Sequence, residues 1–174
     1  MKLSATQEKF VLHWGEMGAR WGLNRTVAQI HALLLVSPDP LAADEIAATL
    51  GVARSNVSTS LRELQGWGVV RISHKMGDRK DYFSTLDDVW EMFRVIAAKR
   101  KEREIDPTAD VLRECIEESA KRKSEAHSNR RMREVLELID VMSTWYEQMD
   151  RLPPAAITKG ARLGAKLGKL LGGK

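Results

Sequence analysis

The sequence has a single cysteine, Cys115, in 174 residues. One thiol cannot form an intramolecular disulfide or a zinc site built from several cysteines, and it is typical of a reducing compartment, so we expect a cytoplasmic protein. There is no run of 18 apolar residues and no signal-peptide pattern, so we expect neither a membrane-spanning helix nor secretion. Cys115 falls in an apolar pattern with Leu112 and Ile116, which predicts a buried, unreactive thiol.

Motifs that carry catalysis or metal binding are also missing. The sequence has no Ser-His-Asp spacing, no HExxH, no glycine-rich phosphate loop and no cysteine cluster. The four histidines are scattered at positions 13, 31, 74 and 127. We therefore expect no enzyme, no cofactor and no metal. His31 lies beside an apolar stripe without a partner at metal-ligand spacing, which favours a structural role.

Acidic residues are missing from Ala155 onward, where the chain has five basic residues. The net charge of the whole chain is +4, so the rest of the chain is close to neutral. Glycines at 160, 164, 168 and 172 disfavour a helix, and we expect residues 153–174 to form a flexible basic tail. The alternative is an amphipathic segment that binds the DNA backbone or an anionic membrane surface. Its lysines would lie on one face, with the apolar residues loosely on another: Ile157, Ala161, Leu163, Leu167, Leu170 and Leu171.

Residues 41–67 predict two short helices joined at Gly51, which is a helix-turn-helix. The second helix has apolar residues at the spacing i, i+4, i+7: Val57, Leu61 and Leu64. Its opposite face is small, polar and able to form hydrogen bonds, as a helix in the major groove requires. An ordinary corner between two helices is the alternative. Both helices lack a good N-terminal cap, since Ala42 or Ala43 and Ala53 stand where Ser, Thr or Asp is preferred.

A β-hairpin is predicted directly after the helix-turn-helix. Residues 69–74 and 81–86 are rich in β-branched and aromatic types, and they flank a turn at Gly77. A hairpin in this place is the wing of a winged helix. Asp78 is expected to hold Arg79 in a fixed rotamer for a narrow minor groove. A solvated turn without function is the alternative.

Helices are predicted on both sides of this domain. A helix over residues 4–22 and a central helix over 25–36 precede it, and a helix capped by Asp87 or Asp88 follows it. Asp106 and Pro107 predict the start of another helix. The last helix, about 130–151, has an apolar seam with alternating steps of three and four, which favours a dimer interface over packing inside one chain. The seam consists of Met132, Val135, Ile139, Met142, Tyr146 and Met149.

The predicted fold is mainly α with a small β-hairpin wing: a winged helix-turn-helix with flanking N- and C-terminal dimerisation helices. The predicted domains are an N-terminal helix (1–23, dimer or core packing), the DNA-binding domain (24–87), C-terminal dimerisation helices (88–152) and the tail (153–174).

Five segments of the sequence resemble the GbsR type of MarR-related bacterial transcription regulators. They are residues 24–30, 40–47, 55–58, 77–83 and 88–93, the last being Asp-Val-Trp-Glu-Met-Phe. The resemblance covers about residues 8–115. It implies a winged-helix homodimer that binds operator DNA, usually as a repressor, with the recognition helix at 53–66 and the wing at 74–82. Some members are associated with compatible-solute genes and quaternary ammonium effectors.

The sequence thus predicts a sequence-specific transcription regulator, a repressor that binds a palindromic operator as a homodimer and is relieved by a small-molecule effector. Its DNA-binding residues would be Arg54, Ser55, Asn56, Ser58, Thr59 and Arg62 in the major groove, with Lys75, Arg79 and Lys80 on the backbone and in the minor groove.

The effector candidates are aromatic side chains able to cage a cation, with core packing as the alternative: Trp14, Trp21, Trp90, Phe93, Trp145 and Tyr146. Two other functions stay open. One is a winged-helix protein-interaction module without specific DNA binding, and the other is a general nucleic-acid binder that depends on the tail.

Overall fold

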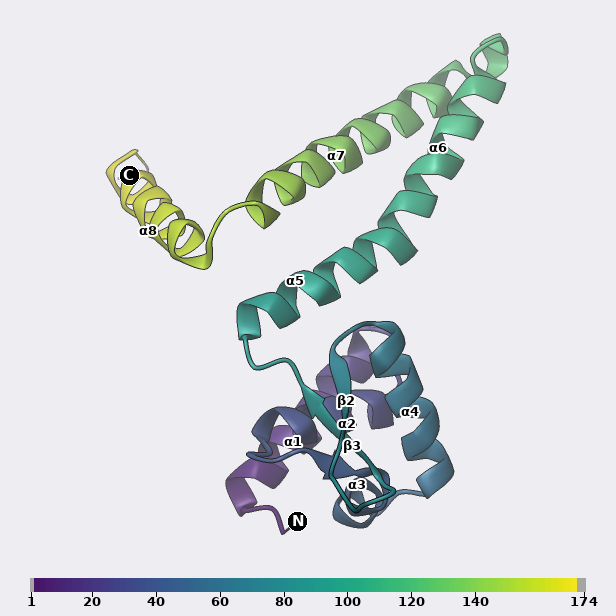
Figure 1. The fold of residues 1–174 in the computed structure, drawn as a ribbon. Helices are drawn as coiled ribbons and strands as arrows, with labels where there is room; N and C mark the ends of the chain where they lie inside the picture. Colours follow the sequence, from purple (N-terminus) through teal and green to yellow (C-terminus); the bar gives the residue numbers. More distant parts are fainter. Residues whose placement is uncertain (1, 172–174) are drawn as a thin grey trace. The chain divides into compact units, whose positions relative to one another are not determined.

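The computed structural model describes residues 2–171, with the side chains of residues 2–122 and 124–164. It divides into two compact units, Met1–Ile96 and Ala97–Lys174. The first unit contains α1 (Ala5–Arg20), α2 (Arg25–Val36), β1 (Leu41–Ala42), α3 (Ala43–Leu50), α4 (Arg54–Gly66), β2 (Val70–His74) and β3 (Asp81–Thr85) (Figure 1). Helix α5 (Val89–Arg100) follows, and then η1 (Lys101–Ile105), α6 (Asp106–Ser119), η2 (Lys123–Glu125), α7 (Ala126–Asp150) and α8 (Pro154–Leu171).

Helix α2 forms the centre of the first unit because its apolar residues cover most of its circumference. Ile30 and Leu33 are fully buried, and the helix packs against α1 on one side and α4 on another. Gly15 and Gly18 let α1 approach closely, since a Cβ at Gly18 would overlap the Cβ of Ala28. These glycines therefore serve helix packing, although each lowers the helix propensity of α1.

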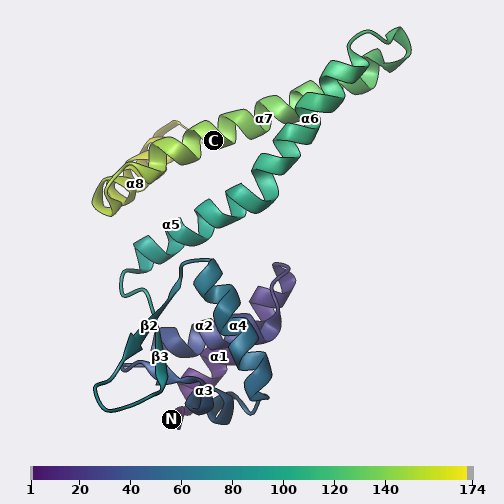
Figure 2. The ribbon, with the colours of Figure 1, turned by 45° about the vertical axis from the view of Figure 1, so that its right-hand side comes forward.

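The three strands form one small antiparallel sheet in the order β1-β3-β2 (Figure 2). Phe83 in the middle strand is paired with Leu41 on one side and Ile72 on the other. Tyr82, Phe83 and Thr85 of β3 are buried, so burial does not alternate strictly along this middle strand. The predicted fold, mainly α with a hairpin wing behind a helix-turn-helix, is confirmed.

Two local features explain how α3, the first helix of the helix-turn-helix, begins and ends. Gly51 ends α3 in the left-handed conformation, with φ of 64°. At the other end of α3, the Glu45 carboxylate accepts a hydrogen bond of 2.7 Å from the backbone N–H of Ala42. The side chain of Glu45 thus satisfies a backbone donor next to the missing cap. Ala53 precedes α4 and has no equivalent side-chain cap.

Helix α6 begins at Asp106, where the sequence predicts a helix start, but Asp106 is not its N-cap and no break precedes it. The backbone stays helical from α5 through η1 into α6, and Asp106 itself has helical φ and ψ of −62° and −45°. The π-helical turn η1 ends at Ile105, two residues before Pro107, which has no N–H to donate and whose ring needs space in the preceding turn. The carboxylate of Asp106 is paired with Lys101 at 2.7 Å and does not cap the helix.

Helices α6 and α7 pack side by side as an antiparallel pair (Figures 1 and 2). Arg113 forms a 3.0 Å ion pair with Asp140, and the Asn129 amide donates to the Ile116 carbonyl oxygen at 2.8 Å. Cys115 is half-buried on α6, so it is less buried than the sequence predicts.

The predicted seam of α7 is divided by this packing. Met132, Ile139, Tyr146 and Met149 are half-buried, whereas Val135 and Met142 are exposed. Together with Leu136 and Ser143, which are also half-buried, the half-buried seam positions repeat every three or four residues and belong to the face packed on α6. The exposed positions adjoin further exposed apolar side chains of the same helix: Leu138, Val141 and Trp145.

The end of the chain differs from the expected flexible tail. Residues Pro154–Leu171 form α8. Proline is favoured at the first position of a helix, where its N–H is not needed, and the segment has apolar residues at helical spacing. No helix of the described residues is long and apolar enough to cross a membrane.

The two units do not follow the predicted domain borders. Helix α1 belongs to the first unit, because Val11 is buried and Phe10 and Trp14 pack against its core. The border between the units falls after Ile96 within α5, not at residue 87, because Met92 is buried in that same core.

Candidate nucleic-acid interface

Helix α4 separates its residues into a buried face and an exposed face. Val57, Leu61 and Leu64 are buried in the core of the first unit. All six residues predicted for the major groove are exposed along the other face: Arg54, Ser55, Asn56, Ser58, Thr59 and Arg62. The burial of three apolar side chains thus fixes the rotation of the helix and presents the polar face to solvent.

The three basic residues predicted on the wing differ in their surroundings, although all are exposed. The ammonium of Lys75 lies over the ring of Tyr82, 3.9 Å from its centroid. Lys80 forms a 2.8 Å ion pair with Asp44 at the start of α3. Within the described residues, the side chain of Arg79 has no hydrogen bond or ion pair. Arg79 is therefore the wing residue whose charge is least compensated.

The expected contact between Asp78 and Arg79 is absent from the described structure, because Asp78 has two other partners. Its carboxylate accepts a 2.7 Å hydrogen bond from the hydroxyl of Tyr82 and a 2.9 Å hydrogen bond from the backbone N–H of Lys80. The bond from Tyr82 lowers the pKa of Asp78 below its usual range and raises that of Tyr82. Asp78 thus stabilises the backbone of the turn.

The link between Lys80 and Asp44 joins the wing to the helix-turn-helix. The hydrogen bond lowers the pKa of Asp44 and raises that of Lys80. Asp44 lies 36 positions from Lys80 in the sequence, so no local pattern indicates this pair, and only the folded sheet brings the two residues together. Where the two strands of the wing meet the turn, the Nε2 of His74 lies 3.0 Å from the Oδ1 of Asp81.

A cleft with a volume of about 380 Å³ lies between α4 and the wing. Its lining includes five of the nine predicted DNA contacts: Arg54, Ser58, Arg62, Arg79 and Lys80. The two acids in the lining are Asp44, which is paired with Lys80, and Asp81, which contacts His74. Side chains from three separate segments thus give this cleft a positive balance of charge.

His31 has the structural role that the sequence favours. It is buried, and its Nε2 lies 3.2 Å from the Oγ1 of Thr85. The hydroxyl of Thr85 donates its one proton to the carbonyl oxygen of Val69 at 3.0 Å, so Nε2 is the donor toward Thr85. Burial lowers the pKa of His31 to about 4, and the ring is neutral at pH 7.

Five of the six aromatic effector candidates lie on α1, α5 and α7, and Trp21 is the C-cap residue that follows α1. Trp14 packs against the core and its ring lies 5.4 Å from that of Phe10, as the alternative of core packing predicts. Trp21, Trp90, Phe93 and Trp145 are exposed, and Tyr146 is half-buried on the face of α7 that packs on α6. An effector site built from these residues stays a prediction.

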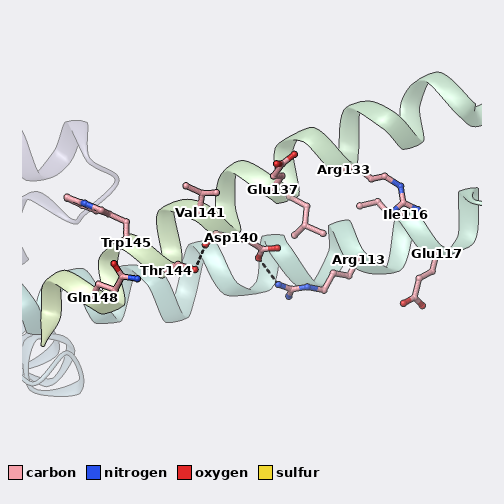
Figure 3. A pocket seen from close by; sticks show the side chains of 11 residues that line it. Arg113, Ile116, Glu117, Arg133, Glu137, Asp140, Val141, Thr144, Trp145 and Gln148 are labelled. Carbon is pink, nitrogen blue, oxygen red and sulfur yellow. Dashed lines mark hydrogen bonds and ion pairs between the residues drawn. The ribbon is translucent and has the colours of Figure 1, made fainter. Parts of the chain in front are cut away.

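The second unit has its own open groove along α6 and α7, with a volume of about 800 Å³ (Figure 3). Figure 3 shows Arg113 on α6 joined to Asp140 on α7, with Trp145 near one end of the groove and Glu117 near the other. Trp145 is 58% exposed. The groove continues into the exposed apolar face of α7. The apolar seam in the sequence could not indicate this groove, because the spacing does not show which of the seam residues α6 covers.

No family model and no curated protein matches the chain. Among solved structures, the chain is similar to a crystal structure of a transcriptional regulator, with a TM-score of 0.69 and 22% identity. The similarity covers 83% of this chain and 95% of that chain. It shows that the two proteins share a fold.

Two further solved structures are similar to the chain at lower TM-scores. A MarR-family transcriptional regulator from Rhodococcus sp. RHA1 has a TM-score of 0.37 and 12% identity, over 95% of this chain and 87% of that chain. A mutant of S. aureus MepR bound to an oligodeoxyribonucleotide has a TM-score of 0.40 and 12% identity, over 79% of this chain and 92% of that chain.

Proposed function

We propose that the protein is a DNA-binding transcription regulator whose α4 enters the major groove of an operator while the wing contacts the flanking backbone and minor groove. The observation that supports this most strongly is the cleft between α4 and the wing, with Arg54, Arg62, Arg79 and Lys80 in its lining. Basic side chains at this spacing can neutralise neighbouring phosphates. The exposed hydroxyls and amide of α4 can accept or donate hydrogen bonds at base edges.

The individual residues are proposed to differ in their contribution. Within the described residues, Arg54 and Arg79 have no hydrogen bond or ion pair from their side chains, so binding to phosphate breaks no existing contact. Arg62 donates weakly, at 3.4 Å, to Ser58 and Thr59 of its own helix. Because Lys80 is already paired with Asp44, we propose that it contributes less than Arg79 and mainly fixes the wing.

We propose that the regulator is a homodimer that binds a palindromic operator, because one winged helix contacts one half-site. The support is the exposed apolar face of α7, where Val135, Leu138, Val141, Met142 and Trp145 are 45% to 62% exposed. An apolar face of this extent on one helix is typical of a protein–protein interface. A symmetric pairing of two copies would cover it.

The resemblance of the five sequence segments supports the finer assignment to the GbsR type and a role as repressor. A small-molecule effector is proposed on the same ground. Its test is tryptophan fluorescence against choline, glycine betaine and aromatic acids, together with operator binding. A saturable change that also releases operator DNA is expected, and the absence of both changes would remove the effector from the proposal.

The proposed function is tested by a gel shift on the DNA immediately upstream of the gene that encodes the chain. Wild-type protein should shift this fragment at concentrations that leave a random fragment of equal length free. Arg54→Ala should weaken the shift, whereas Lys121→Ala, an exposed control in the second unit, should not. A protein-interaction module would show no salt-dependent shift of any promoter fragment, and that result would refute the proposal.

A further inference from the structure

Helix α8 combines positive charge with apolar surface and has no acidic residue. From Arg151 to the end of the sequence there are six basic residues and no Asp or Glu. In the described part of α8, Lys159 and Arg162 are exposed, and Leu163 is 59% exposed. No other described element packs extensively against α8. The helix therefore has both kinds of surface available to a partner.

The sequence spacing separates these two kinds of residue around the helix. At 100° per residue, positions 159, 162, 166 and 169 fall within an arc of roughly 80°. Positions 157, 163, 167, 170 and 171 fall on a separate arc of roughly 140°. Four basic residues thus lie on one side, and Ile and four Leu lie on another. Glycines 160 and 164 add no polar group to the apolar arc.

This combination fits an anionic lipid surface better than a nucleic acid. Contact with DNA phosphates uses lysine and arginine but gives no reason for five large aliphatic residues on an adjacent arc. At a bilayer surface, the basic arc lies among anionic headgroups and the apolar arc enters the acyl boundary. Pairing with α8 of a second copy would cover the apolar arc, but it would bring two basic arcs together, because α8 has no acidic residue. The positive charge of α8 therefore favours a surface of anionic lipids as its partner.

We propose that α8 is an interfacial amphipathic helix through which the protein binds the surface of membranes that contain anionic lipids. The helix lies in the plane of the surface, with Leu163 directed into the acyl boundary and Lys159 and Arg162 at the headgroups. This activity is separate from the proposed binding of operator DNA by α4 and the wing. It uses residues that the DNA-binding proposal leaves unused.

The test is co-sedimentation of the full chain with vesicles of phosphatidylcholine alone and of phosphatidylcholine mixed equally with phosphatidylglycerol. Wild-type protein should bind the mixed vesicles and not the neutral ones. The double variant Lys159→Glu, Arg162→Glu should lower the affinity by roughly tenfold or more. The matched control, Lys9→Glu with Lys121→Glu, makes the same change of charge at exposed positions elsewhere and should bind nearly as wild type.

The variant Leu163→Ser distinguishes lipid from nucleic acid. It keeps every charge and removes one exposed apolar side chain, so it should weaken vesicle binding and leave affinity for a random-sequence duplex unchanged. Equal binding to both kinds of vesicle, no binding to either, or full binding by the double variant would overturn the proposal. It would also be overturned if the double variant lost affinity for the duplex while vesicle binding stayed unchanged. Far-UV circular dichroism checks that each variant is folded.

Discussion

The buried His31 should make the first unit sensitive to acid. Its side chain is 5% exposed, and burial lowers its pKa from 6.5 to about 4. Between these two values the unfolded chain binds a proton that the folded chain excludes. The free energy of unfolding therefore falls as the pH decreases from about 6.5 toward 4, and the stabilisation is complete above that window.

The size of the effect follows from the two pKa values. The full shift corresponds to a loss of about 3 kcal/mol once both states are protonated, and the loss between pH 7 and pH 5 is about 2 kcal/mol. This is a large part of the 5 to 15 kcal/mol that is typical of a folded domain. A change of this size is measurable by urea unfolding.

The assay is urea unfolding of the full chain at pH 7, 6 and 5, followed by tryptophan fluorescence. His31→Gln keeps a donor for Thr85 and cannot be protonated in this range. All other titratable groups are present in both proteins, so the difference between their pH dependences isolates His31. Wild type should lose about 2 kcal/mol more than the variant between pH 7 and pH 5. Parallel loss in the two proteins would show that His31 is not buried in its neutral form.

Two further predictions concern packing and assembly. Gly18→Ala should lower the free energy of unfolding by about 1 to 3 kcal/mol, because its Cβ would overlap that of Ala28. The control Gly160→Ala, at a helical position with open space, should not lower it. Equal effects of the two variants in urea unfolding would contradict the close approach of α1 and α2. Leu138→Glu should shift the protein from dimer to monomer in analytical ultracentrifugation, whereas Leu163→Glu, which is similarly exposed, should not. A monomeric wild type, or a Leu138→Glu variant that remains a dimer, would refute the proposed interface.

The sequence was most informative where a single pattern decided the structure. The spacing of Val57, Leu61 and Leu64 predicted the buried face of α4, and thereby its exposed polar face. The helix predicted over 25–36 is found as Arg25–Val36. Gly51 and Gly77 both have positive φ at the predicted turns. In each case the relevant interaction is local or follows from one apolar face, so periodicity and turn chemistry were sufficient.

The predictions that failed depended on competition between partners. Asp78 was expected to hold Arg79, but Tyr82, which follows four residues later, donates to it instead. Asp106 was expected to cap a new helix; α6 does begin there, but the preceding backbone stays helical and the Asp106 carboxylate pairs with Lys101 instead. In α7, the apolar spacing could not show that Ile139 faces a helix of the same chain while Met142 is exposed. Which partner each of these side chains contacts depends on its neighbours in the folded structure, and a short stretch of sequence does not show them.

The most direct test of the DNA-binding proposal is the salt dependence of operator affinity for wild type and Arg79→Ala. Fluorescence anisotropy of a labelled upstream fragment, titrated at several salt concentrations, gives both the affinity and the slope of its logarithm against that of salt. If Arg79 binds a phosphate or the minor groove, the variant should bind more weakly and its slope should be smaller by about one unit. Lys121→Ala serves as the control. Unchanged affinity and slope in Arg79→Ala would contradict the account and remove the wing from the interface.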